Sequence, residues 1–117
     1  MNRYVVLYTA PVSVTERFAQ ATPEEAQAGV QAWIDWAQRC GPNLIDAGKP
    51  FGRAMSVTAS GVAPATSTIV GMSILQGESM ADAMAMVDNH HHLRWAEGCE
   101  ILVLEEMQIP EMAETAN

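Results

Sequence analysis

The sequence predicts an α+β domain, a ferredoxin-like βαββαβ sandwich, and three observations lead to this prediction. The chain has 117 residues, which is the size of a single domain. Two segments carry the capping residues and apolar spacing of helices. At least four segments carry strand-forming residues, and they alternate with the helices in the order β-α-β-β-α-β when one weak strand is set aside. A sheet with two helices on one face fits this order.

The first predicted strand occupies residues 4–8, where β-branched and aromatic side chains dominate. It ends near Pro11, because proline has no N–H to donate to a sheet. Residues 11–21 are expected to form an irregular loop, and the apolar Phe18 is expected to anchor this loop to the body of the protein.

A first helix is predicted over residues 23–40. Thr22 and Glu25 have the spacing of a capping box, in which each side chain accepts a hydrogen bond from the other residue's backbone N–H. Pro23 suits the first helical position, where its missing N–H costs nothing. Gly41, which a second proline follows, ends the helix.

The rest of the chain alternates strand and helix signals. Strands are predicted at residues 44–48, weakly at residues 54–59, and most clearly at residues 66–75. A second helix is predicted over residues 79–88, because a serine and an aspartate have the capping-box spacing at its start. The last strand is predicted at residues 100–107, before a proline that ends it.

The predicted domain spans residues 1–110, and residues 111–117 are expected to form a flexible C-terminal tail. Two helices can cover only one face of its sheet. In the strand at residues 66–75, however, both faces carry apolar side chains, with Val70 on one and Ile69 on the other. An uncovered apolar face needs a partner, and the simplest partner is a second copy. The sequence therefore predicts a homodimer with its sheets packed face to face, a dimeric α+β barrel.

The charge balance argues against two classes of partner. Fourteen acidic residues outnumber six basic ones, and the net charge is −8. Nucleic acids and anionic membranes are bound by clustered Lys and Arg, whereas the six cations are scattered along this chain. No apolar run approaches the roughly 20 residues of a membrane span, and strand-like sequence begins too early for a signal peptide. We therefore expect a cytoplasmic protein that binds neither nucleic acid nor membranes.

Several segments together resemble the YCII-related family. They are the first strand, the start of the first helix, and residues 46–52, 57–61, 71–76 and 89–105. In the last segment family members tend to read Gly-His-Pro-His-Leu, and this chain reads Asn89-His90-His91-His92-Leu93. The resemblance covers residues 4–110 and implies the same ferredoxin-like fold and dimeric barrel.

What the resemblance implies about activity is limited to a small part of the family. Most members are uncharacterised, and a few are implicated in the dehalogenation of aromatic breakdown products, with a His–Asp pair proposed at the site. This chain departs from the family pattern in two places. It has His91 where relatives have proline, and its first helix lacks the histidine that some relatives carry there.

The histidines of the chain are contiguous, His90 to His92, and acid–base chemistry at neutral pH is the function that they suggest. In a helix neighbouring side chains point about 100° apart and cannot converge. In extended backbone His90 and His92 share one side and His91 faces away. The functional interpretation is that His90 and His92 line a cavity as catalytic groups, with Asp46 or Asp88 orienting one imidazole. The alternative is a polar turn after the second helix, with one ring capping the helix C-terminus and the others in solvent.

Asp46 is the candidate catalytic partner of these imidazoles. It lies between apolar neighbours just before a turn rich in glycine and proline, and a carboxylate can orient an imidazole and select its tautomer. The alternative is that Asp46 accepts hydrogen bonds from backbone N–H groups near Gly48. Two histidines could hold a divalent ion only with a further ligand, for which Asp46 is the only attractive candidate. Neither a metal nor another cofactor is predicted.

Trp95, Tyr8 and Ser73 are the candidate substrate-binding residues. Trp95 follows the histidines closely, and Tyr8 and Ser73 are polar residues of predicted strands that could face a cavity. Two hypotheses follow. The first is a small cofactor-free enzyme that acts on an apolar or aromatic small molecule by His/Asp acid–base chemistry, as a lyase, dehydrohalogenase or isomerase does. The second is a non-catalytic homodimeric module that binds a small molecule or a protein.

Overall fold

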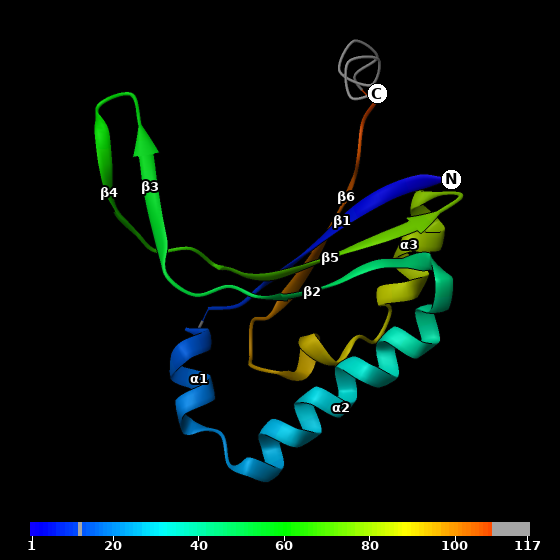
Figure 1. The fold of residues 1–117 in the computed structure, drawn as a ribbon, viewed down its shortest axis with the longest axis horizontal. Helices are drawn as coiled ribbons and strands as arrows, with labels where there is room; N and C mark the ends of the chain where they lie inside the picture. The colour runs from blue at the N-terminus through cyan, green and yellow to red at the C-terminus, as the bar shows by residue number, and fades with distance from the viewer. Residues whose placement is uncertain (12, 109–117) are drawn as a thin grey trace.

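The computed structural model of the chain describes residues 1–11 and 13–108. Its main sheet has four antiparallel strands in the order β2-β5-β1-β6, namely β1 (Asn2–Thr9), β2 (Leu44–Pro50), β5 (Ile69–Gly77) and β6 (Glu100–Glu105). A hairpin of β3 (Ala54–Thr58) and β4 (Gly61–Ala65) projects from one end of this sheet (Figure 1). The α+β class is therefore confirmed. The predicted tail at residues 111–117 lies outside the described residues.

The helices of the described residues all lie on one side of the main sheet (Figure 1). They are α1 (Val14–Gln20), α2 (Pro23–Cys40), α3 (Met80–Val87) and two short 3-10 helices, η1 (Gly41–Asn43) and η2 (His91–Arg94). The bounds of α2 are those predicted from the sequence. Glu25 N–H donates to Thr22 Oγ1 at 3.1 Å, and Thr22 N–H donates to the Glu25 carboxylate at 3.3 Å, so the capping box is present.

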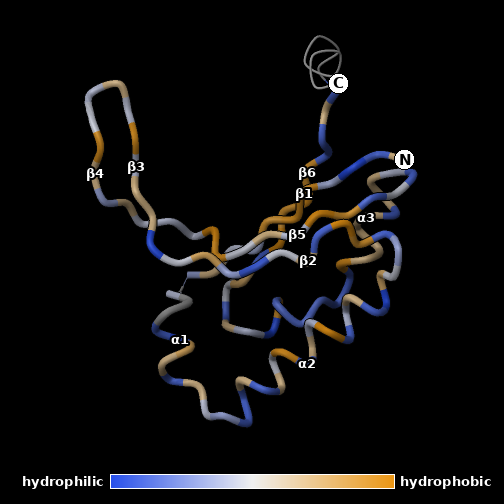
Figure 2. Tube along the Cα trace, viewed as in Figure 1, coloured by the Kyte–Doolittle hydropathy of each residue, from blue (hydrophilic) through white to orange (hydrophobic). Residues whose placement is uncertain are grey.

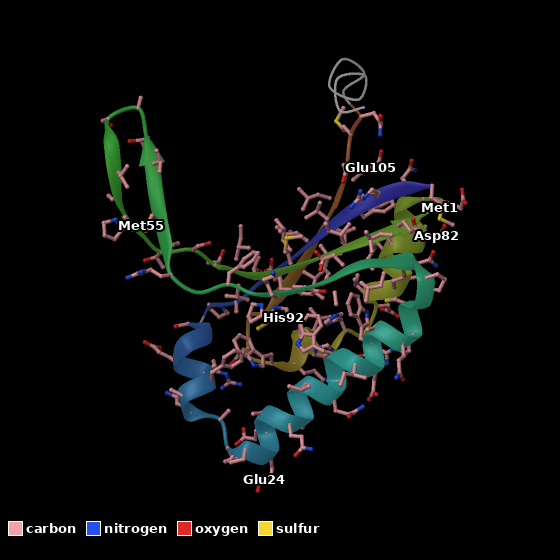
Figure 3. The ribbon with its side chains drawn as sticks, viewed as in Figure 1. Met1, Glu24, Met55, Asp82, His92 and Glu105 are labelled. Carbon is pink, nitrogen blue, oxygen red and sulfur yellow. The ribbon has the colours of Figure 1, made fainter. Side chains whose placement is uncertain are left out.

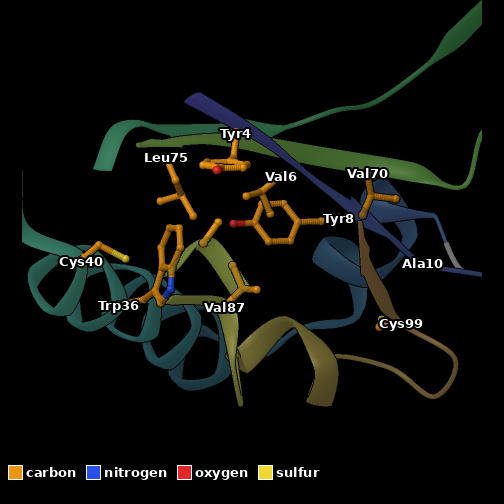
Figure 4. Packing of buried hydrophobic residues seen from close by; sticks show 11 residues of the cluster. Tyr4, Val6, Tyr8, Ala10, Trp36, Cys40, Val70, Leu75, Val87 and Cys99 are labelled. Carbon is orange, nitrogen blue, oxygen red and sulfur yellow. The ribbon is translucent and has the colours of Figure 1, made fainter. Parts of the chain in front are cut away.

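The core lies between this helical layer and the sheet, as Figure 4 shows. Alternate residues of β1 point toward the helices, and Tyr4, Val6 and Tyr8 are buried there. Trp36 packs against them from α2, and its indole N–H donates to the Met86 carbonyl at 2.8 Å. Because that N–H is satisfied, the whole ring can be buried without a polar penalty.

No helix of residues 1–11 and 13–108 lies over the opposite face of the sheet (Figure 1), and much of the central strands is hydrophobic in sequence (Figure 2). Register brings residues of three strands together on this face, which we call the open face: Val5, Leu7, Met72, Ile74, Leu102 and Leu104. Leu102 and Leu104 are each 46% exposed, and the other four are half-buried. The face is apolar and continuous, which is typical of a surface that packs against another one.

Two segments differ from the sequence-based expectation. The irregular loop predicted for residues 11–21 is wrong, because α1 forms there. Ser13 Oγ accepts a hydrogen bond from Glu16 N–H at 3.3 Å, and the Ser13-x-x-Glu16 spacing was the missed signal for this helix start. Phe18 is 59% exposed and does not anchor the segment in the core.

The strand predicted over residues 66–75 also begins later than expected. β5 starts at Ile69, and the residues before it contribute β4, a strand that the sequence reading missed. β4 pairs with β3 through a two-residue connection, and Gly61 takes a φ of +142° at its start. Within the described residues, no helix has the length and apolar character of a membrane-crossing segment.

Candidate functional site

A groove of about 840 Å³ opens between α1, α2, the strands β2 and β5, and the turn at η2. Its walls are formed largely by apolar and aromatic side chains, among them Phe18, Val30, Trp33, His91 and Trp95. The volume lies within the range of about 300–1,000 Å³ that small-molecule pockets have. In Figure 3 the side chain of His92 lies between the sheet and α2, beside this groove.

Behind the groove wall, buried polar groups form a chain of hydrogen bonds from β2 to η2. Ser73 Oγ donates to the Ala47 carbonyl at 2.7 Å, and Tyr8 Oη lies 2.8 Å from Ser73 Oγ. Tyr8 Oη also lies 3.5 Å from His90 Nε2, and His92 N–H donates to His90 Nδ1 at 3.0 Å. The Ala47 carbonyl can only accept a hydrogen bond, so the Ser73 hydroxyl donates to it. The Tyr8 hydroxyl therefore donates to Ser73 Oγ and accepts a hydrogen bond from His90 Nε2.

This directionality selects one tautomer of His90. Its Nδ1 accepts from a backbone N–H and therefore carries no proton, so the ring proton is on Nε2 and points at Tyr8. Burial, together with the smaller influence of the neighbouring His91 and His92, lowers the pKa of His90 to about 3. Burial also raises the pKa of Tyr8. Both groups are therefore neutral at pH 7, and both nitrogens of His90 are occupied inside the protein.

His92 is also buried, and it faces the groove. Its Nε2 lies 2.8 Å from the Thr9 carbonyl, which can only accept, so Nε2 carries the proton. Nδ1 makes no hydrogen bond within residues 1–11 and 13–108 and keeps its lone pair. Burial lowers the pKa of His92, and the hydrogen bond to Thr9 opposes that shift. His92 is therefore a neutral imidazole with one available basic nitrogen.

His91 was expected to face away from its neighbours, and the structure places it in the groove wall instead. Its ring stacks on His90 at a centroid distance of 4.2 Å and meets the Trp33 ring edge-on at 4.5 Å. The reason is that His90 caps the 3-10 helix η2, so the triplet is not extended. Burial lowers the pKa of His91 to about 4. Its Nε2 is buried with no hydrogen-bond partner among the described residues.

Asp46, the third predicted catalytic residue, lies away from the histidines. It is exposed on β2, in register with Ile74 of the open face, and its Oδ1 accepts from Gly48 N–H at 2.7 Å. This is the turn-stabilising alternative that the sequence also allowed. Gly48 has a φ of +82°, and a Cβ there would lie 1.4 Å from the Met72 carbonyl oxygen, so the turn requires glycine.

The three predicted substrate-binding residues have different positions. Trp95 and Tyr8 line the groove, whereas Ser73 is fully buried behind it and completes the hydrogen-bonded chain. Sequence reasoning missed Arg17, whose guanidinium carbon lies 5.4 Å from the centre of the Trp95 ring and which donates to the Trp95 carbonyl. It also missed Arg94, which donates to Asn89 Oδ1 at 2.6 Å. Only the tertiary fold brings both cations to the lining of one groove.

In the part of the chain that the structure describes, no three His, Cys, Asp or Glu side chains gather in a way that could hold a metal ion. No protein-family model matches the chain, and no curated protein matches it. The function must therefore be argued from the groove.

Proposed function

We propose that the protein is a homodimer that binds an apolar or aromatic small molecule in the groove. The observation that carries this proposal is the groove itself, because its volume and its aromatic walls suit a ring-containing ligand. Trp33, Trp95 and His91 present ring surfaces from two different elements, which allows a flat molecule to be held between them. No cofactor is part of the proposal.

Acid–base catalysis on the bound molecule is the second candidate, and His92 favours it. Because Nε2 of His92 donates to the Thr9 carbonyl, Nδ1 is its basic nitrogen, and the residue lines the groove. A neutral imidazole beside an apolar ligand can accept a proton from it, as lyase-, dehydrohalogenase- and isomerase-type reactions require. His90 is a poorer candidate, since both of its nitrogens are occupied, and Asp46 is bonded to its own turn. In this form of the proposal His92 acts without an orienting Asp46 from the same subunit.

The strand order β2-β5-β1-β6, with all helices on one side, supports a ferredoxin-like sandwich as the finer description of the fold. The open face supports the homodimer, because a second copy would cover an apolar surface of the same size and shape. Two sheets stacked in this way form a dimeric α+β barrel, the assembly that the resemblance to the YCII-related family implies. A cytoplasmic location belongs to the same proposal, and the free thiols of Cys40 and Cys99 are consistent with it.

A neutral apolar fluorophore, N-phenyl-1-naphthylamine, tests the binding proposal. Its fluorescence should rise when it enters the groove of the wild-type protein. Val30→Asp places a charge in the groove wall and should abolish this rise, because the dye cannot satisfy a carboxylate there.

Ile34→Asp is the matched control, since it makes the same kind of change at an exposed position of the same helix outside the groove lining. It should leave the rise in fluorescence intact. Equal signals from the two variants, or no signal from the wild type, would contradict the proposal. Circular dichroism of both variants establishes that each is folded.

A further inference from the structure

The groove gathers positive charge in a chain that is strongly acidic. Arg17, Lys49 and Arg94 line it, which is three of the six basic residues of the chain, and Glu25 is the one acidic residue that lines it among residues 1–11 and 13–108. The formal charge of the lining is therefore +2, although the net charge of the chain is −8. A local charge of the opposite sign attracts anions to the groove and repels cations from it.

Two of these cations lie next to Trp95, one in sequence and one in contact. Arg17 lies over the ring of Trp95 and donates to its carbonyl, while Arg94, the residue before Trp95, donates to Asn89 Oδ1. Both acceptors are neutral oxygens, so they hold each guanidinium in place without cancelling its charge. In residues 1–11 and 13–108 the only ion pair joins Arg3 and Glu106. A guanidinium has five N–H donors, so each arginine retains donors for a ligand.

The remaining walls are largely apolar. Val30 and Trp33 contribute from α2, and Phe18 contributes from α1. The histidines add no charge at pH 7, because burial lowers the pKa of His91 to about 4 and also lowers that of His92. The electrostatic selectivity of the groove therefore comes from Arg17 and Arg94, because Lys49 pairs in register with Met72 of the open face.

We propose that the groove selects molecules that combine an apolar or aromatic body with a carboxylate, and that Arg17 and Arg94 bind the carboxylate. This inference rests on the proposed function, that the groove is a small-molecule site, and names the charge of its ligand. Arginine forms paired, charge-assisted hydrogen bonds with a carboxylate, which gives direction as well as attraction. Because both arginines are partly in water, the carboxylate contributes about tenfold in affinity.

Three probes with the same ring system and different charge test the inference: 2-naphthoate, 2-naphthalenemethanol and 2-naphthylmethylamine. Their dissociation constants are measured by calorimetry at low and at high salt. We expect 2-naphthoate to bind about tenfold more tightly than the alcohol at low salt, and the amine to bind most weakly. The preference for the acid should shrink as salt screens the arginines.

Arg17→Gln and Arg94→Gln should each weaken 2-naphthoate binding several-fold and leave binding of the alcohol unchanged. Arg53→Gln is the matched control, because it removes the same charge from a residue that does not line the groove. Arg94→Lys guards against a local rearrangement around Asn89, and it should retain most of the preference for the acid.

The outcomes separate this inference from the proposed function. Equal binding of the acid and the alcohol would overturn the inference and leave the groove as a small-molecule site. An effect of Arg53→Gln as large as that of Arg17→Gln would also overturn it, because net charge alone would then explain the preference. Failure of all three probes to bind would overturn both proposals.

Discussion

The two faces of the main sheet differ in the kind of side chain that they carry and in how far it is buried. The face under the helices contains polar groups, Tyr8, Ser73 and His90, and each of them finds a hydrogen-bond partner within the same chain. The open face contains only apolar side chains at its centre, and they remain half-exposed. Hydrogen bonds need partner groups at defined positions, and the fold of one chain supplies them. The hydrophobic effect has no direction, so an apolar surface can be covered by any surface of complementary shape. The proposed ligand site therefore belongs to the covered face, and the proposed assembly belongs to the open face.

The largest expected effect is on the open face. Leu102→Asp would place an unpaired carboxylate in the proposed dimer interface, and burying such a charge costs several kcal/mol. We expect the dimer dissociation constant to rise a hundredfold or more. Light scattering during gel filtration should then report a chain of 12.6 kDa instead of a dimer.

Ile34→Asp is the control on the helical side, and it should leave the mass of the assembly unchanged. A wild-type protein that is already monomeric at micromolar concentration would contradict the proposed role of the open face.

Tyr8→Phe is expected to have a smaller effect, on the stability of the covered face. It removes the hydroxyl that joins Ser73 to His90, and leaving these buried groups unpartnered should lower the free energy of unfolding by about 1–3 kcal/mol. Urea unfolding measures the change. The double variant Tyr8→Phe/Ser73→Ala should cost less than the sum of the single variants, because the same bond is lost in each. Strict additivity would show that the two hydroxyls are not coupled.

The histidines should make stability depend on pH. An unfolded histidine binds a proton near pH 6.5, whereas folded His90 does so only near pH 3. The unfolded state therefore binds more protons between these values, and stability falls as the pH falls below 6.5. Each histidine with a lowered pKa contributes a slope of up to about 1.4 kcal/mol per pH unit.

Urea unfolding between pH 7 and pH 5 measures this slope before most carboxylates titrate. NMR of the imidazole protons should show that His90 and His91 do not titrate over the same range. A solvent-like titration near pH 6.5 for either ring would contradict its burial.

The smallest effect is expected for Asp46→Ala. It removes one hydrogen bond to Gly48 N–H at an exposed turn and should cost about 1 kcal/mol or less. The imidazole shifts of His90 and His92 should not move, because the carboxylate faces its own turn. A clear change in either titration would contradict this position of the carboxylate.

Local signals in the sequence were sufficient for the elements that local interactions stabilise. The bounds of α2 follow from Thr22, Glu25 and Gly41, because capping involves residues within one turn of each other. The same logic applies to α1, whose Ser13-x-x-Glu16 signal was present and was not used. The α+β class follows from the alternation of such elements.

The candidate site was predicted only in part. Tyr8, His92 and Trp95 are predicted site residues because their side chains suit a cavity, and in the structure all three line one groove. His91 is not among the predicted site residues, because extended backbone would point its side chain away from His90 and His92. The structure forms a 3-10 helix there instead. Asp46 was chosen for its apolar neighbours in sequence, although strand register decides which face a side chain occupies.

The sequence by itself determined the helix ends, the fold class and the presence of more apolar strand surface than two helices can cover. These properties depend on neighbouring residues and on composition. Only the tertiary structure decided the tautomer of His90, the bonding of Asp46 to its own turn and the placement of Arg17 and Arg94 in the lining of one groove. These properties depend on distances between residues far apart in the chain, which packing sets and no local pattern records.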